Sequence, residues 1–319
     1  MTRRPARRLP VWLALLPLAA GLGGYYLWWQ GEAAAFGKAV AAYAPVTSVG
    51  GFPYRIEATL GSVAFARERA GVTLSLSVRQ ATVNRQPWRT GHVVIAAADP
   101  GIDVAVATIA GARLRVSGPG ALASVRRPGQ ILERLSAHFD RAEVELPFAG
   151  RFAASDFEVH LRETPTRTGK RTVTGPVQAE ARMAGTLSRD DLGFGIELPL
   201  FVTDDAPIAS LAGWRGGGTL EVRGGRLLTA KGEAVAGFDA TLAVLPDGRV
   251  AVSGTIDTEC PATVTAFLTG GAAATEYRAR RSQRLPVSGF ADAIEVGAPI
   301  GPSGGRARNL EPPCPGLRR

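Results

Sequence analysis

The chain has 319 residues, of which 45% are hydrophobic, 20% charged and 7% aromatic, enough for one large or two medium domains with a sizeable core. The formal net charge of +9 invites a nucleic-acid-binding interpretation, but residues 1–30 and 276–319 carry +4 each and residues 31–275 only +1. A nearly neutral body argues against nucleic acid as a partner. With 3 His and 2 Cys, multi-cysteine zinc sites and iron–sulfur clusters are disfavoured as well.

The first thirty residues have the pattern of a membrane anchor. The basic residues at the start are Arg3, Arg4, Arg7 and Arg8. An uncharged segment of twenty residues follows, Pro10 to Trp29, and about twenty helical residues span the ~30 Å hydrocarbon core of a bilayer. It ends in residues that prefer the headgroup zone, Tyr25, Tyr26, Trp28 and Trp29. By the positive-inside rule we expect residues 1–30 to form a cytoplasmic tip and single transmembrane helix in the bacterial inner membrane, with the body in the periplasm.

A cleaved signal peptide is the alternative interpretation of the same segment. The charged start fits it, and Ala33 to Ala35 offer small residues for cleavage. The uncharged segment is longer than the usual apolar region of about 7–15 residues, and bulky aromatic residues stand where a signal peptide relaxes into small ones. These two features favour a retained anchor.

Period-two alternation dominates the first half of the exported part, residues 31–188, and predicts half-buried antiparallel strands. We expect them at 55–60, 62–65, 71–78, 92–98, 102–108, 112–116, 141–146, 152–161 and 173–187. Two helices interrupt the pattern. One is a short extension of the anchor over 32–43, and the other lies at Gln130–Phe139, where Ile131, Leu132, Leu135 and Phe139 have helical spacing. Residues 162–172 are expected to form an exposed loop.

The second half, residues 189–300, reads as a ladder of short strands with two short helices. The strands are expected at 219–222, 226–230, 234–245, 249–256 and 291–296, and the helices at 207–214 and 261–268. Turns are expected at Gly224–Gly225 and at Asp247–Gly248, and Gly216 to Gly218 also read as turn residues, not as a phosphate cradle. Residues 301–319 form a Pro/Gly-rich basic tail. The predicted fold class is therefore mainly β with a few short helices: one N-terminal transmembrane helix followed by an elongated, curved antiparallel β-sheet.

The two cysteines, Cys260 and Cys314, are an even pair, which an oxidising compartment can join into a disulfide. Such a bond would tie the tail to the body. Two unpaired thiols are the alternative, because the sequence does not show that the two residues approach each other.

No catalytic or metal-binding motif stands out. His92, His138 and His160 are far apart in sequence and are expected to be isolated from one another. There is no paired-histidine metal motif, and no nucleophile elbow is present. We therefore expect no enzyme activity, no cofactor and no metal.

Two short motifs about thirty residues apart form the best cluster in the chain. The first is Gly51-Phe52-Pro53-Tyr54-Arg55, and the second is Gln86-Pro87-Trp88 followed by His92. Their large side chains read as a hydrophobic plug at one end of a sheet. With the N-terminal anchor and the late Gly-rich strand ladder, these motifs resemble the alphaproteobacterial domain-of-unknown-function family 2125, whose members are membrane-anchored envelope proteins. The resemblance implies location and architecture and carries over no catalytic residue; a weaker similarity in style links the chain to AsmA-like envelope proteins, which handle lipids.

These features together predict a membrane-anchored periplasmic β-rich protein that serves envelope maintenance through contact with lipid or another hydrophobic ligand. The alternatives are a structural partner of another envelope protein in an inner-membrane complex and, less favoured, an envelope hydrolase.

Overall fold

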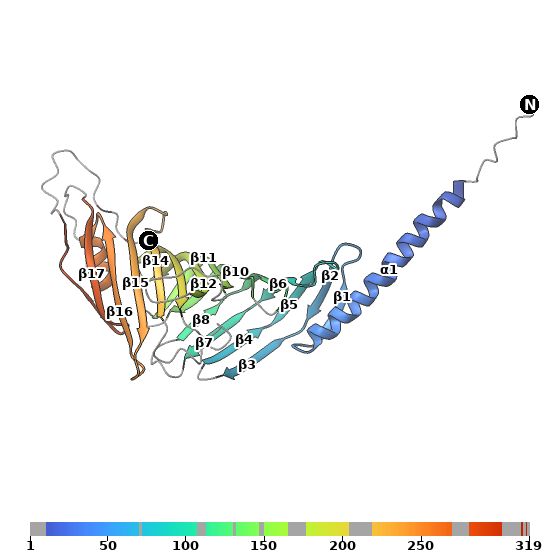
Figure 1. Ribbon diagram of the computed structural model, residues 1–319, viewed down its shortest axis with the longest axis horizontal. Helices are drawn as coiled ribbons and strands as arrows, with labels where there is room; N and C mark the ends of the chain where they lie inside the picture. Colours follow the sequence, from blue (N-terminus) through green and yellow to red (C-terminus); the bar gives the residue numbers. More distant parts are fainter. Residues whose placement is uncertain are drawn as a thin grey trace, which may run out of the picture.

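The computed structural model describes residues 11–69, 72–106, 113–129, 132–146, 150–164, 177–203, 219–269, 281–301, 314 and 317. A long helix, α1 (Val11–Ala41), extends from one end of an elongated, curved antiparallel sheet, and a short helix, α2 (Pro261–Thr269), lies near the other end (Figure 1). The prediction of a mainly β fold with few helices is confirmed.

The strands follow one another in a meander. Their bounds are β1 (Val46–Gly50), β2 (Ile56–Leu60), β3 (Val63–Arg69), β4 (Val72–Val78), β5 (Gln80–Arg85), β6 (His92–Ala98), β7 (Gly101–Val106), β8 (Arg113–Ser117), β9 (Gly120–Arg126), β10 (Arg134–Leu146), β11 (Gly150–Glu163), β12 (Val177–Arg189), β13 (Leu192–Thr203), β14 (Thr219–Thr229), β15 (Ala234–Val244), β16 (Val250–Thr258), β17 (Gln283–Phe290) and β18 (Ala293–Val296).

Near α1, pairs of consecutive strands are halves of longer strands. Leu60 pairs with Ala81 and Val63 with Val78, so β2–β3 and β4–β5 keep one register across a short break. The same holds for β6–β7 against β8–β9. β10 closes this half by pairing with β9 along its first part and with β8 further on. From β10 to β18 each strand pairs with the next one along the chain, and β1 pairs with β2.

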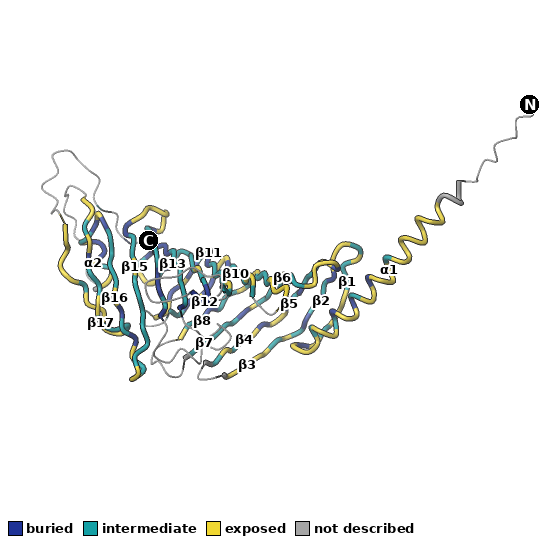
Figure 2. Tube along the Cα trace, in the orientation of Figure 1, coloured by how far each residue is buried: buried dark blue, intermediate teal, exposed yellow. Residues whose placement is uncertain are grey.

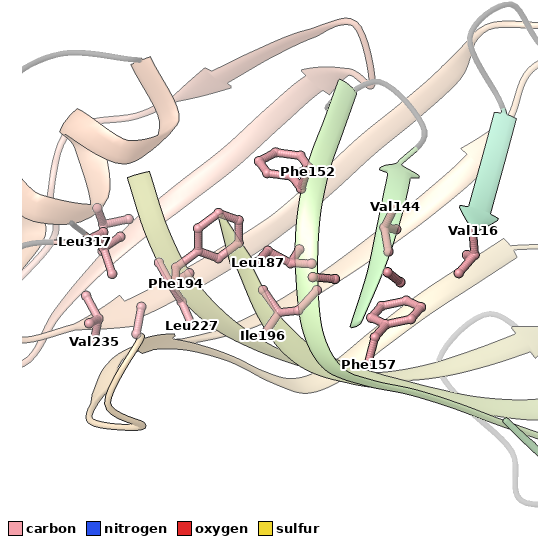
Figure 3. Close-up of a cluster of buried hydrophobic side chains, with 14 of the residues drawn as sticks. Val116, Val144, Phe152, Phe157, Leu187, Phe194, Ile196, Leu227, Val235 and Leu317 are labelled. Carbon is pink, nitrogen blue, oxygen red and sulfur yellow. The ribbon is translucent and has the colours of Figure 1, made fainter. Parts of the chain in front are cut away.

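The main core lies on one face of this sheet. Ala154, Leu187 and Phe194 are cross-strand neighbours on β11, β12 and β13 and are all buried, because alternate residues of a strand point to the same face. Figure 3 shows Leu187 and Phe194 gathered with other buried side chains of this cluster. Phe267 of α2 packs edge-on against Phe194, with ring centroids 4.9 Å apart. The second helix thus covers part of the apolar face.

The tail is fastened to the same core. Cys260, at the start of α2, forms a disulfide with Cys314. Leu317 is buried, and its carbonyl accepts a hydrogen bond from the Gly193 amide at 3.2 Å. The bond and the buried leucine hold the described part of the tail against the sheet.

The helix predicted at Gln130–Phe139 is wrong, because residues 134–139 belong to β10. Leu135, Ala137 and Phe139 also alternate at period two, and β10 is hydrogen-bonded to β9 on one side and β11 on the other. Two flanking strands satisfy the backbone of β10 on both edges, and this tertiary pairing outweighs the local helical spacing.

The turn predicted at Gly224–Gly225 is also wrong. β14 continues through both glycines, and its register with β15 shifts between Val222 and Gly225, so the pair marks a bulge. Gly224 has φ +66°, and a Cβ on Gly225 would lie 2.7 Å from the Phe238 ring. The glycines serve a close approach inside the sheet, whereas the turn at Asp247–Gly248 and the helix at 261–268 are as predicted.

Several sequence-based expectations lie outside the described residues: the four N-terminal arginines, the helix at 207–214, Gly216 to Gly218, and most of both the 162–172 loop and the 301–319 tail. Across the expected domain boundary at 188/189, β12 pairs with β13 along its length, and the division into halves stays a prediction.

Candidate functional site

The two halves of α1 have different surroundings. Trp29, Ala33 and Phe36 follow one another at helical spacing and are buried against β2 and β5. Their main partners, Ile56 and Ala58, are fully buried. The N-terminal half is exposed along its described length, as Figure 2 shows. Its exposed leucines are Leu15, Leu16, Leu18 and Leu22.

An arginine on β5 holds the docked half of α1. The Arg85 side chain is only 9% exposed and pairs with the Glu32 carboxylate at 2.9 Å. Its guanidinium also donates to the Glu32 carbonyl at 3.2 Å and lies 4.9 Å from the centre of the Phe36 ring. The same nitrogen, Nη2, makes both hydrogen bonds, and together with the stacking on Phe36 they fix the helix against the strand.

The loop between β1 and β2 contains the first sequence motif and grips α1 through its aromatic side chain. The Phe52 ring lies edge-on to Tyr26 and Trp29, with centroids 5.2 and 5.5 Å away. The Phe52–Pro53 peptide is cis. Gly51 has φ +101°, and a Cβ there would lie 2.8 Å from the Arg55 carbonyl oxygen. Glycine is required at this position because side chains avoid positive φ and because the loop backbone closes over it.

Two side-chain donors of α1 bind the backbone of the same loop. The Tyr25 hydroxyl donates to the Pro53 carbonyl at 2.5 Å, and the Trp29 indole N–H donates to the Arg55 carbonyl at 3.1 Å. Both contacts satisfy backbone carbonyls of the loop, so the loop is fixed relative to the helix. We call the contacts of Tyr25, Tyr26 and Trp29 with the Phe52 loop, together with the Glu32–Arg85 pair, the helix–sheet joint.

The second motif lies at the same end of the sheet. Ile56 pairs with Arg85, so the loops before β2 and after β5 leave the sheet side by side. Pro87 is fully buried while Trp88 is 55% exposed, and Tyr54 of the neighbouring loop is 76% exposed. The structure thus brings both motifs together at one tip, with Phe52 in the joint and Tyr54 and Trp88 facing outward. The Gln86 backbone carbonyl accepts a hydrogen bond from the Arg89 amide in a turn.

Sequence reasoning missed the contacts that make the joint. The helical spacing of Trp29, Ala33 and Phe36 was the available signal, because it marks one apolar stripe that runs from the end of the predicted anchor into its predicted helical extension. Glu32 and Arg85 carried no such signal, since their 53-residue separation closes only through the sheet.

The three histidines, predicted to be isolated, lie on one polar face of the sheet. His92 on β6 is 2.9 Å from the Ser124 hydroxyl, and Ser124 pairs with Ser136 across β9 and β10. Ser136 in turn is 2.9 Å from His160 Nδ1 on β11. The expectation of isolation is therefore wrong, because antiparallel pairing aligns residues that are far apart in sequence.

The Glu158 carboxylate contacts two of the three histidines. Glu158 lies 3.3 Å from His160 and 3.5 Å from His138, which also contacts Asp140 at 2.9 Å. Serine, histidine and glutamate follow in the order of a catalytic triad, but they stand on an open strand surface where His160 is 40% exposed. Among the described residues, no group of three or more His, Cys, Asp and Glu side chains is placed to hold a metal ion.

The same polar face carries an open groove of about 650 Å³ along the strand breaks, lined by small residues such as Ser77, Gly101 and Ser117. Beside it, Asp103 accepts hydrogen bonds from Arg113 (Nε, 2.9 Å) and Arg115 (Nη2, 3.1 Å). The hydrogen bond from Arg113 holds the pKa of Asp103 below its ordinary value, against an opposing effect of burial. Small side chains therefore line this groove, and ion pairs lie beside it.

Within the ranges that the structure describes, no helix combines the length and apolar character that crossing a membrane requires.

A family model described as "Uncharacterized protein conserved in bacteria (DUF2125)" matches residues 28–290. The chain belongs to the DUF2125 family. The match begins in the aromatic part of α1 and includes both motifs of the joint and β1 to β17. The family assignment made from the motifs is confirmed. No curated protein and no solved structure matches this DUF2125 chain.

Proposed function

We propose that this DUF2125 protein is a single-pass protein of the bacterial inner membrane that holds its sheet in the periplasm. Its role is envelope maintenance through contact with lipid or another hydrophobic ligand, without catalysis. The observation that carries the proposal is the change of surroundings along α1. One half docks on the sheet, and the other presents leucines that no described part of the chain covers.

The sequence supports a membrane as the cover for that half. Pro10 to Trp29 contain no charged residue, and Arg3, Arg4, Arg7 and Arg8 precede them. Leu15, Leu18 and Leu22 are each more than half exposed. Burying one leucine side chain in an apolar medium is worth about 1.5–3 kcal/mol, so several together favour insertion strongly. The likeness to lipid-handling AsmA-like proteins, which are also anchored and β-rich, supports the same proposal by analogy.

Alkaline carbonate extraction of bacterial membranes that contain the full chain tests the anchor. We expect the wild-type chain to stay in the membrane pellet. The variant Leu18→Arg/Leu22→Arg places two charges in the exposed half and should shift the chain into the supernatant, because each arginine costs about 2.5–3.5 kcal/mol at the centre of a membrane helix.

The matched control is Ala34→Arg/Ala35→Arg, which adds the same charge to exposed positions of the docked half. It should remain in the pellet like the wild type. Extraction of the wild-type chain by carbonate would overturn the proposal.

A further inference from the structure

We infer that the aromatic tip of the sheet, formed by Phe52, Tyr54 and Trp88, seats in the headgroup layer of the bilayer that α1 enters. The inference rests on the proposed membrane anchor and adds a second point of membrane contact to it. The body would then be held against the bilayer surface instead of swinging freely below a single helix.

The loop that carries Phe52 and Tyr54 is held at the point along α1 where the helix would leave the hydrocarbon. The uncharged segment of the sequence ends at Trp29, so its aromatic end marks where the helix would leave the hydrocarbon. Tyr25 and Trp29 in this stretch donate hydrogen bonds to the carbonyls of Pro53 and Arg55. The loop that carries Phe52 and Tyr54 is therefore fixed at the same level along α1 as the expected interface.

The side chains of Tyr54 and Trp88 are exposed to solvent while the backbone beside them is held in place. Tyr54 is 76% exposed and Trp88 55% exposed, and each extends from a neighbour that is fixed in place. Tyr54 follows the gripped Pro53, and Trp88 follows the fully buried Pro87. Large exposed aromatic side chains with a polar edge are suited to the layer between water and hydrocarbon. Because their backbones are held, inserting them costs little additional ordering.

A basic side chain stands next to each of the two exposed aromatic residues. Arg89, next to Trp88, is exposed, and Arg55, next to Tyr54, is 62% exposed while pairing with Glu57 at 3.0 Å. A basic residue beside each inserted aromatic side chain is attracted to anionic headgroups. Aromatic and basic side chains that lie together where the helix would leave the membrane favour a lipid surface, and not a protein, as the partner of this tip.

Depth measurements on the full chain test the inference. Single cysteines at Tyr54→Cys and Trp88→Cys, with the native disulfide kept, would carry a fluorophore in phosphatidylethanolamine–phosphatidylglycerol vesicles. Nitroxide lipids labelled in the headgroup or in the acyl chain would quench it. Leu22→Cys serves as the reference for the bilayer interior and Asp247→Cys, in the exposed β15–β16 turn, as the reference for water.

We expect headgroup nitroxides to quench labels 54 and 88 at least threefold more than label 247, and acyl-chain nitroxides to quench label 22. Labels 54 and 88 that behave like label 247, with label 22 quenched, would overturn the inference and leave the anchor standing. If label 22 also behaves like label 247, the anchor itself is wrong.

A variant gives an independent readout. In Tyr54→Asp/Trp88→Asp, a label at Arg89→Cys should lose its headgroup quenching while label 22 keeps its own. Tyr43→Asp is the matched control, because Tyr43 is 75% exposed but lies beyond the C-terminal end of α1. It should leave label 89 quenched; unchanged quenching of label 89 in the double variant would count against the tip as the contact.

Discussion

At the scale of single residues, Gly51 is the strictest requirement of the joint. Its φ of +101° and the 2.8 Å approach of the Arg55 carbonyl oxygen to a would-be Cβ exclude any side chain. We expect Gly51→Ala to lower the free energy of unfolding by about 1–3 kcal/mol. The measurement is urea unfolding of the full chain in detergent, followed by circular dichroism.

The neighbouring Gly50 is the matched control for this prediction. A Cβ there would have no atom within 4 Å, and its φ is not in the positive region. Gly50→Ala should leave the unfolding midpoint unchanged or raise it slightly, since alanine restricts the unfolded chain. Equal loss in both variants would show that the loop geometry of Gly51 is not what matters.

Asp103 gives a pH-dependent prediction. Its folded-state pKa lies below the ordinary value of 3.8, chiefly through the hydrogen bond from Arg113. Its stabilisation is therefore fully present above the pKa of the unfolded chain and is lost as the pH falls through the folded pKa. We expect Asp103→Asn to lower the urea midpoint at pH 6, with the gap to the wild type narrowing below pH 4.

The comparison variant is Asp292→Asn, which removes an exposed carboxylate in the β17–β18 turn. The difference in urea midpoint between this variant and the wild type should be small and should vary little over the same pH range. A constant gap for Asp103→Asn from pH 6 to pH 3 would contradict the assigned ion pair.

At the scale of elements, the docking of α1 depends on one narrow stripe. Ala33 is 6% exposed within the cluster formed with β2 and β5, whereas Ala34 is exposed. We expect Ala33→Glu to destabilise the joint by more than about 2 kcal/mol, because an unpaired carboxylate would be buried, and to speed hydrogen exchange in β1 and β2.

Ala34→Glu carries the same charge one residue away and should leave exchange in β1 and β2 unchanged. Equal exchange rates in the two variants would mean that α1 does not pack on the sheet through this stripe.

The disulfide of α2 is the other fastening element. Cys260 and Cys314 are 54 residues apart in sequence, and a crosslink over such a loop stabilises by about 2–4 kcal/mol in the chain-entropy view. We expect a reductant to lower the urea midpoint of the wild-type chain and to have no effect on Cys260→Ala/Cys314→Ala. A midpoint that reductant does not move would show that the bond contributes nothing to stability.

How far the sequence predicts these elements depends on how local their signals are. The alternation in β4 (Val72–Val78) and the turn at Asp247–Gly248 are local, and both are found in the structure. β13 (Leu192–Thr203) was missed although apolar residues stand at every second position from Leu192 to Val202, since Pro199 and two glycines within it are residues that strands disfavour. Residues 134–139 were read as helix because both periods fit them, and only the flanking strands decide.

The candidate site shows the same limit. Its two motifs stood out by their glycine, proline and aromatic residues, which act within a few positions. The sequence did not reveal that Phe52 meets Tyr26, because this contact depends on the docking of α1 on the sheet. It did not reveal that the three histidines share one face, because strand register brings together residues 24 to 32 positions apart.

At the scale of the whole molecule, the protein is one meander sheet with α1 docked on its first strands. Figure 1 shows α1 leaving the sheet beside β1 and β2, with β16 and β17 at the far end, where Figure 2 places α2. Because each strand pairs mainly with its neighbours in sequence, the sheet can extend the body away from the joint without distant chain crossings. We propose that this body stands on the periplasmic side of a membrane that α1 would cross.

Cysteine labelling in intact bacterial cells tests that claim most directly. Asp247→Cys, in the far-end turn, and Thr2→Cys, before the arginines, would each be treated with a membrane-impermeant maleimide after outer-membrane permeabilisation. We expect position 247 to be labelled in intact spheroplasts and position 2 to be labelled only after lysis. Protection of position 247 until lysis would contradict the claim.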